Sequence, residues 1–527
     1  MSPPPTSVSG DQQVWPPHAL EALSRLNASI PPEWHISEDL LTKYPPGSDV
    51  REVARASGIL SEKELRITDP SFDAVSLLET LAQQAVSCLA DYFFEEGLAR
   101  AKELDVYYEQ QGKLVGPLHG LPISVKGTYN VKGRPSIAGF SKFVIADNTS
   151  YALEILQAAG AILYCKTNLP QTVMHLECHS FLGLTLNPRN TLLSSGGSSG
   201  GCGALMAFGG SPMSMGSDIG GSLRQPAAAN GLWTLKPTSL RVPEWYDTVR
   251  SSSAPQCRSL RDTSLFFRVI LDAQPWFNEQ SIVPIPWRID SGPGWRGHKG
   301  TIRVGFLRHD GVVMPHPPIT RGIDTLEKAL RSDPKFEVID IQPYKQKYVG
   351  DLAFSLYFCD GGARYRQLQN YSRDPLLPLS KFLLDHPSAK DHSIHELWKL
   401  NLEREAYRAE YLTHWNTHKL DLLICPVNPQ TAPQHETSRY WNYTSVFNVV
   451  DYPAATFPTG LFVDAELDRS DSPLPIMSEL DKDTRSLYSA VKYANTPICL
   501  QAVAYRYEEE RVVKALEVLS KHLPLRP

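Results

Sequence analysis

The sequence has no long apolar segment and no excess of positive charge. Its apolar runs, such as the one from Leu265 to Leu271, fall far short of the roughly 20 residues that a membrane-spanning helix needs. The net charge of −5 gives no reason to expect nucleic acid or an anionic membrane surface as a partner. The first residues lack the basic region and apolar core of a secretory signal, so we expect none there.

Paired cysteine motifs are also absent. The eight cysteines are scattered without any C-x-x-C pair, and several lie in apolar strings such as "LLICPV". This pattern predicts free, buried thiols in a reducing compartment, and we expect a cytoplasmic protein. The remaining composition, 42% hydrophobic and 21% charged residues, is that of an ordinary globular protein.

Several catalytic motifs fail on one residue. The stretch from Ser194 to Asn230 is rich in glycine and serine but holds no lysine, which excludes a phosphate-binding loop. The nucleophile-elbow pattern G-x-S-x-G fails at Arg224, and the matching letters "GGSSG" at 196–200 follow no clear strand. The zinc motif H-E-x-x-H fails because position 399 is lysine. We expect neither a metal nor a cofactor.

"DHSIHELW" at 391–398 has a different explanation from metal binding. Its histidines, His392 and His395, lie beside Glu396. Ser393 with Glu396 three residues later is typical of a capping box that opens a helix.

Apolar periodicity predicts an α/β protein. Residues 73–105 keep apolar spacings of three and four without proline, which indicates long amphipathic helices. "LPISVKG" and "AILYCK" are β-rich runs that predict buried strands. A Pro/Gly-rich break near 274–299 precedes further alternating strands and helices, up to a helix within 508–523. We therefore predict an N-terminal extension at 1–57, partly helical or loose, and one catalytic body at 58–523 with a lid-like, substrate-shaping insertion at about 275–440.

The Gly/Ser-rich stretch suggests a nucleophile turn. It contains ten glycines and eight serines, but its apolar residues argue against a flexible linker. Glycines at 220 and 221 would let the backbone N–H groups of Ile219, Gly220, Gly221 and Ser222 converge on one point. Such a cluster suits a tetrahedral oxyanion, where one donor is worth roughly 3–4 kcal/mol. A glycine-rich structural loop is the alternative interpretation.

Three motifs in order resemble the amidase signature family of serine hydrolases. "GPLHGLPISVKG" is similar to the segment that carries the family's catalytic lysine, and "GGSSGG" with "GSDIGGSLRQPA" is similar to its serine motifs. Downstream, "VVDYPAATFPTG" resembles the fungal acetamidase-like, general amidase branch. The resemblance covers roughly Gly58 to Leu523. It implies a single α/β/α domain around a mixed sheet of about eleven strands, and a homodimer as in relatives.

The resemblance also implies a Ser-Ser-Lys triad. Ser222 would attack the amide carbonyl, Ser198, after a cis peptide bond, would relay its proton, and Lys126 would accept it as a neutral amine. Burial at the end of "LPISV" should lower the lysine pKa, in agreement with this role. A histidine such as His119 or His175 is the alternative base.

Further residues are assigned around the triad. Asp218 and Arg224 flank the turn and are interpreted as an ion pair that fixes its shape, with two separate surface charges as the alternative. Met174 and Tyr129, by their position in the family, are assigned to substrate binding, with core packing as the alternative. Ser199, next to Ser198, is also assigned to substrate binding and is expected to act as a supporting hydrogen-bond partner.

The sequence departs from the family pattern at three positions, none of them in the triad. Gly127 stands where an acidic residue usually follows the lysine, Cys165 replaces a glycine, and Ser217 replaces a threonine. Cys165 and Cys202 are interpreted as packing residues.

The implied activity is hydrolysis of a small-molecule carboxylic acid amide to the acid and ammonia or an amine. Acyl transfer to an amine, ammonia supply as a glutamine amidotransferase-type subunit, and a catalytically silent binding protein are the alternatives.

Overall fold

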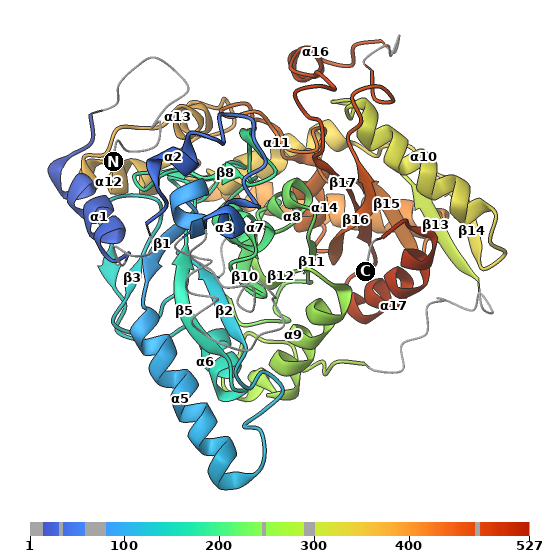
Figure 1. Ribbon diagram of the computed structural model, residues 1–527. Coiled ribbons are helices and arrows are strands. Elements are labelled where there is room, and N and C mark those ends of the chain that lie inside the picture. Colours follow the sequence, from blue (N-terminus) through green and yellow to red (C-terminus); the bar gives the residue numbers. More distant parts are fainter. Residues whose placement is uncertain are drawn as a thin grey trace.

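A mixed β-sheet runs through the centre of the molecule (Figure 1). The computed structural model describes residues 14–30, 35–57, 81–244, 249–288, 301–469 and 475–525, and within them eleven strands form this sheet. In sheet order they are β1 (Leu89–Tyr92), β5 (Ile162–Thr167), β2 (Pro122–Lys126), β10 (Met213–Asp218), β12 (Ser252–Cys257), β11 (Trp233–Lys236), β16 (Ala454–Phe462), β17 (Pro497–Val503), β15 (Leu422–Pro426), β13 (Ile302–Phe306) and β14 (Phe336–Asp340). Both parallel and antiparallel pairs occur, so the predicted α/β class and mixed sheet are confirmed.

Helices cover both faces of this sheet. One face packs against α6 (Tyr151–Ala158), α9 (Leu260–Asp272), α10 (Pro317–Arg331) and α17 (Glu509–Leu519) in one apolar cluster. The other face carries α7 (Gly200–Phe208), α8 (Arg224–Asn230), α11 (Gln346–Tyr357), α14 (Ile394–Thr417) and α15 (Asn442–Val449). In β15, Leu422 and Ile424 pack on the first side, while Leu423 and Cys425 pack on the second. This alternation follows from the two-residue period of a strand.

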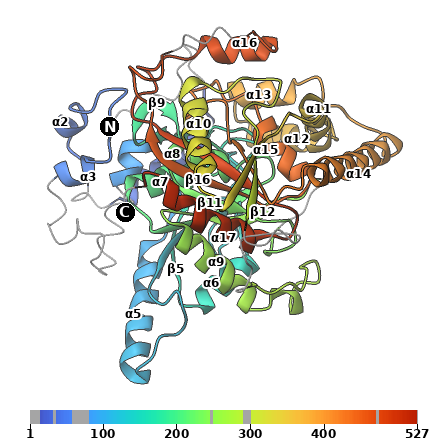
Figure 2. The same cartoon turned by 90° about the vertical axis from the view of Figure 1, so that its right-hand side faces the viewer.

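Smaller elements surround these three layers. Three short hairpins pair β3 (Pro135–Ser136) with β4 (Val144–Ile145), β6 (His179–Ser180) with β7 (Gly183–Leu184), and β8 (Leu186–Asn187) with β9 (Asn190–Ser194). The remaining helices are a short one at 81–86, α5 (Phe94–Gln111), α12 (Ala363–Ser372), α13 (Pro378–Leu384) and α16 (Glu479–Ser486), with single 3₁₀ turns at Pro275–Phe277 and Ser520–His522. Both views show α5 projecting away from the body (Figures 1 and 2).

The N-terminal segment is helical where the structure describes it. It contains α1 (Pro17–Ala28), α2 (Glu38–Leu41) and α3 (Val53–Ala56). Apolar residues of α1 pack against Leu169 and Phe181, and those of α3 against Leu81. These three helices therefore pack on the main body and share apolar clusters with it.

Most of the predicted strands and helices are present. The strands expected in "LPISVKG" and "AILYCK" are β2 and β5, and the C-terminal helix is α17. All eight cysteines are free, and all except Cys359 are buried. In the part of the chain that the structure describes, no helix has the length and apolar character needed to span a membrane.

Two expectations need correction. Residues 73–80 lie outside the described residues. The predicted run of helix to 105 is interrupted by β1, an edge strand of the sheet, which pairs with β5 through Leu89↔Thr167 and Tyr92↔Cys165. The pairing partner lies far along the chain, so local periodicity does not reveal this strand. The segment 275–440, expected as a lid-like insertion, contributes β13, β14 and β15 to the central sheet, so that part is integral to the body.

Candidate active site

Lys126 is the last residue of β2, and the pleat of that strand sets the direction of its side chain. Ile123 and Val125 pack into the cluster that contains α6 and α9, which turns Lys126 to the opposite face of the sheet. There Lys126 Nζ donates hydrogen bonds to Ser198 Oγ at 2.7 Å and to Ser217 Oγ at 3.1 Å. The two serine-containing segments thus meet at one amine.

The environment of Lys126 favours the neutral amine. The side chain is fully buried, and this burial lowers its pKa to about 8, although the nearby Cys202, Glu244 and Asp218 act in the opposite direction. An ammonium in a buried site loses its hydration, which is the physical origin of the shift. Lys126 therefore has a large neutral fraction in mildly alkaline solution, as a proton acceptor requires.

Ser198 lies between β9 and α7, and the peptide bond that precedes it, from Gly197, is cis. The next residue, Ser199, donates its backbone N–H to Ser222 O at 3.0 Å, which ties the two glycine-rich segments together. Ser199 itself is fully buried. The structure therefore gives Ser199 the supporting position behind Ser222 that was expected of a hydrogen-bond partner, and not the substrate contact that was also assigned to it.

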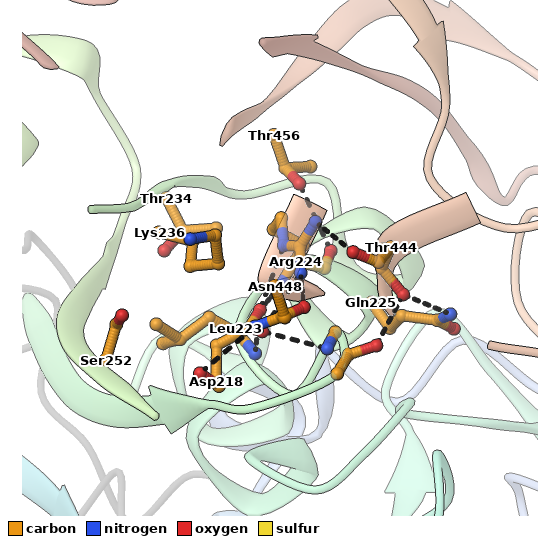
Figure 3. A network of polar contacts seen from close by, with 12 residues as sticks. Asp218, Leu223, Arg224, Gln225, Thr234, Lys236, Ser252, Thr444, Asn448 and Thr456 are labelled. Carbon is orange, nitrogen blue, oxygen red and sulfur yellow. Dashed lines mark hydrogen bonds and ion pairs between the residues drawn. The ribbon is translucent and has the colours of Figure 1, made fainter. Parts of the chain in front are cut away.

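The turn that carries Ser222 joins β10 to α8 and is closed by the predicted ion pair. Arg224 Nε donates to Asp218 Oδ2 and Arg224 Nη2 donates to Asp218 Oδ1, each at 3.0 Å (Figure 3). Neither side chain is accessible to solvent. Arg224 also donates to Thr444 O and to the side chains of Asn448 and Gln501. The pair thus connects the turn to α15 and β17.

Asp218 also binds the backbone of the turn. It accepts hydrogen bonds from Gly221 N at 2.8 Å, Leu223 N at 3.2 Å and Asn448 Nδ2 at 3.0 Å. Burial by itself would raise the pKa of Asp218, but the Arg224 guanidinium and the hydrogen bonds hold that pKa well below its usual range. Asp218 is therefore an ionised anchor for the turn.

This anchor changes the set of amides available as an oxyanion hole. The N–H of Gly221 donates to Asp218 and is therefore not available to an oxyanion. The expectation that all four amides of residues 219–222 would serve as donors is wrong for this one. The N–H groups of Ile219, Gly220 and Ser222 have no protein acceptor within the described ranges. These three amides are the free donors of the turn.

The residues of the expected triad share one cavity of about 390 Å³. Ser222 lines it beside Lys126 and Ser198, and the Ser222 hydroxyl has no hydrogen-bond partner among the described residues. The apolar side chains of the wall are Ile137, Val173, Met174, Ile219, Tyr365 and Leu368. Such a volume, with a few polar groups converging on an apolar wall, is typical of a small-molecule site.

Two residues assigned to substrate binding do line this cavity. Met174 is part of its wall, and Tyr129 borders it. The Tyr129 hydroxyl is bonded to Gly216 O at 2.8 Å and Ser253 Oγ at 2.7 Å, and burial raises its pKa. Tyr129 therefore borders the cavity while its hydroxyl connects β10 and β12.

The two alternative histidine bases lie elsewhere. His175 is buried with its nitrogens against Glu177 O and Ser380 Oγ, and burial lowers its pKa to about 4. His119 Nδ1 accepts the N–H of Val115. Neither residue lines the cavity that contains Ser222.

The expected capping box is present at the start of α14. The Ser393 side chain accepts the N–H of Glu396, and the Glu396 carboxylate accepts the N–H of Ser393. No group of three or more metal-ligating side chains was found in the described part of the chain.

Sequence reasoning missed several residues of the site. Ser217, which accepts a hydrogen bond from Lys126, was noted only as a departure from the family, although its place beside Asp218 was a usable signal. Arg364 and Tyr365 of α12 line the cavity from a segment more than a hundred residues away in sequence. No local pattern marks them, because only the packing of α12 brings them there.

The chain is similar in sequence to known amidases. The Amidase family model matches residues 77–513. The chain is 35% identical to an acetamidase of Emericella nidulans over 548 residues, covering 97% of this chain and 98% of that protein. It is 34% identical to an acetamidase of Aspergillus oryzae, covering 97% and 99%.

A solved structure supports the same relationship. Fatty acid amide hydrolase superposes on this chain with a TM-score of 0.90 at 31% identity, covering 97% of this chain and 95% of that one. The sequence match extends over most of the chain, and the fold matches over nearly all of it. The chain therefore belongs to the amidase signature family and is a hydrolase that acts on amide C–N bonds.

Proposed function

We propose that this chain hydrolyses small carboxylic acid amides through an acyl-enzyme on Ser222 and releases ammonia or an amine. The observation that carries the proposal is the 2.7 Å contact between Lys126 Nζ and Ser198 Oγ in a cavity that Ser222 also lines. Serine is a weak nucleophile unless a base takes its proton, and a buried lysine whose pKa is lowered to about 8 can supply the neutral amine that acts as this base.

The proposed reaction has two steps, acylation of Ser222 and hydrolysis of the acyl-enzyme. Ser222 Oγ attacks the amide carbon, its proton passes to Ser198, and Ser198 gives its own proton to neutral Lys126. The C–N bond then breaks, and the leaving nitrogen takes that proton back through the same relay. In the second step water attacks the Ser222 ester and gives its proton to the relay. The relay returns this proton to Ser222 Oγ as the ester C–O bond breaks, which releases the acid and restores neutral Lys126.

The negative oxygen that forms in each step requires nearby donors. The free N–H groups of Ile219, Gly220 and Ser222 supply them in this proposal, with the turn held by Asp218. Preorganised amides of this kind are often the largest single contribution to such catalysis.

The substrate class follows from the wall of the cavity. Ile137, Val173 and Met174 would contact an apolar acyl group, and the volume of about 390 Å³ suits a small amide. The names of the relatives, acetamidase and fatty acid amide hydrolase, support a neutral amide. The free cysteines support the further proposal that the protein works in a reducing cytoplasm.

The proposal is tested by covalent labelling and product release together. A fluorophosphonate probe should label the native protein on Ser222 and leave Ser222→Ala unlabelled. The native protein should release ammonia from one or more members of a panel of aliphatic, aryl and fatty amides, and Ser222→Ala should not. Absence of labelling of the native protein would instead favour a silent binding protein.

Matched controls distinguish Ser222 from its neighbours. Ser251→Ala removes another serine hydroxyl that lines the cavity and should leave labelling intact. Labelling at Ser198 in place of Ser222 would overturn the assignment of roles.

A further inference from the structure

The carbonyl groups of the nucleophile turn are all held by hydrogen bonds from the protein. The four contacts are Asn448 Nδ2 to Asp218 O at 3.4 Å, Tyr357 Oη to Ile219 O at 2.7 Å, Thr444 Oγ1 to Gly220 O at 2.6 Å, and Gln225 N to Gly221 O at 2.8 Å. The two short side-chain bonds, from Tyr357 and Thr444, reach consecutive carbonyls from helices more than a hundred residues away in the sequence.

These contacts fix the direction of the amides as well as the carbonyls. A peptide group is planar, and in the trans form its C=O and N–H point in opposite directions. The Ile219–Gly220 peptide is trans, so Tyr357, by holding Ile219 O, turns the N–H of Gly220 away from α11. Thr444 in the same way directs the N–H of Gly221 toward Asp218 Oδ1.

The glycines at 220 and 221 are needed for this approach. A Cβ at position 220 would lie 3.0 Å from the Tyr357 hydroxyl oxygen, and a Cβ at position 221 would lie 2.3 Å from Thr444 Oγ1. The φ of Gly221 is +135°, which L-residues rarely adopt. Because glycine has no side chain, the hydroxyls of Tyr357 and Thr444 can come close enough to hold the turn.

Tyr357 is itself held firmly. It ends α11 and packs among Leu352, Leu356 and Ile219. Burial raises its pKa, so the hydroxyl stays protonated and remains a donor. α12, which lines the cavity with Arg364 and Tyr365, follows shortly after it in the chain. Two consecutive helices are therefore involved: α11 holds the turn through Tyr357, and α12 lines the cavity.

We propose that Tyr357 and Thr444 are positioning residues that set the peptide planes of the oxyanion turn, with Tyr357 aiming the free N–H of Gly220 at the oxygen that becomes negative when Ser222 attacks. This inference rests on the proposed function, which takes Ser222 as the attacking group. Neither hydroxyl touches the substrate, and each acts through the backbone that it holds. The fixed amide stabilises the transition state more than the bound amide, because charge develops on the oxygen only during attack.

The first test is Tyr357→Phe, which removes only the hydroxyl. Loss of a true oxyanion donor lowers kcat by about 10²–10³, so a misaimed donor should lower it by roughly tenfold or more. KM should stay within about twofold. Affinity for an alkyl trifluoromethyl ketone, which forms an anionic tetrahedral adduct on Ser222, should weaken by the same factor as kcat/KM.

The matched control is Tyr348→Phe on the same helix. Its hydroxyl bonds Glu403 at 3.3 Å on the exposed side of α11, so its removal should leave kcat and ketone affinity unchanged. An unchanged kcat in Tyr357→Phe, or a lower kcat with unchanged ketone affinity, would overturn the inference. If Ser222→Ala retains activity, the proposed function itself fails, which is a distinct result.

Thr444 gives a second, independent comparison. Thr444→Ser keeps the hydroxyl and should preserve kcat, whereas Thr444→Val keeps the shape and should lower it. Equal kcat values for the valine and serine variants would show that the hydroxyl bond to Gly220 O does not position the turn.

Discussion

Arg224 and Asp218 meet through two hydrogen bonds of 3.0 Å, and both side chains are inaccessible to solvent. Because Asp218 also accepts the N–H groups of Gly221 and Leu223, this ion pair is the link between the ends of the nucleophile turn. Replacing Arg224 alone leaves the Asp218 carboxylate buried without its cation.

Arg224→Met, with Asp218 retained, should therefore destabilise the protein strongly. Breaking a buried pair from one side typically costs about 3–5 kcal/mol, measurable by urea unfolding. Lys347→Met is the control, because Lys347 pairs with Asp351 on the surface at the i,i+4 spacing, and its loss should change stability by about 0.5 kcal/mol or less. Equal effects of the two substitutions would contradict the structural role of Arg224.

The pH dependence of kcat/KM should report Lys126. The mechanism needs the neutral amine, and burial lowers the lysine pKa to about 8, so the rate should rise with pH around 8 and level off above it. Lys126→Ala should lose this ascending limb. His175→Asn should keep it, because His175 has a pKa of about 4 and lies outside the cavity. A limb that survives in Lys126→Ala would point to another base.

Lys126→Met should be inactive and yet more stable than the native protein. A lysine whose folded pKa lies below its unfolded value of 10.5 destabilises the folded state, fully below pH 8 and progressively less up to pH 10.5. A shift from 10.5 to about 8 corresponds to on the order of 3 kcal/mol, as an upper limit to the gain. Urea unfolding at pH 7 and at pH 10.5 measures the gain in the free energy of unfolding of Lys126→Met over the native protein. A gain that grew with pH would contradict this explanation.

Ser222→Ala and Ser198→Ala should not combine additively. Ser222→Ala should abolish turnover, and Ser198→Ala should be severely impaired but retain slow turnover if water relays the proton. Residues of one relay act as a unit, so the double variant should resemble Ser222→Ala. Single-turnover rates measure this. Retention of more than a few per cent of native kcat by Ser222→Ala would disprove its role as nucleophile.

Gly127→Ala should destabilise the protein, because the structure leaves little room for a side chain at position 127. A Cβ at position 127 would lie 2.4 Å from Leu169 Cδ2 and 3.0 Å from Thr167 O. Forcing extra atoms into a packed site typically costs about 1–3 kcal/mol. Adding Leu169→Val should recover part of that loss, because it removes one of the two contacts. A double variant less stable than Gly127→Ala would show that Leu169 is not the obstacle.

The sequence alone predicted those features that depend on residues close together in the chain. The apolar run before Lys126 predicted a buried strand with a lysine at its end, and β2 has that form. Ser393 and Glu396 predicted a cap because the two groups of a capping box lie within one helical turn. The roles of Ser198 and Ser222 were expected from the resemblance of their glycine-rich motifs to the amidase signature family, and both residues line the same cavity.

The rest depended on contacts between segments that are distant in the chain. β1 forms by pairing with β5, which lies far along the chain. The hydrogen bonds of Tyr357 and Thr444 to the turn join residues 138 and 224 positions apart. Sequence thus singled out the groups that we propose carry the chemistry, while tertiary packing decided what holds the peptide groups of the turn, because a hydrogen bond is set by distance in space and not by distance along the chain.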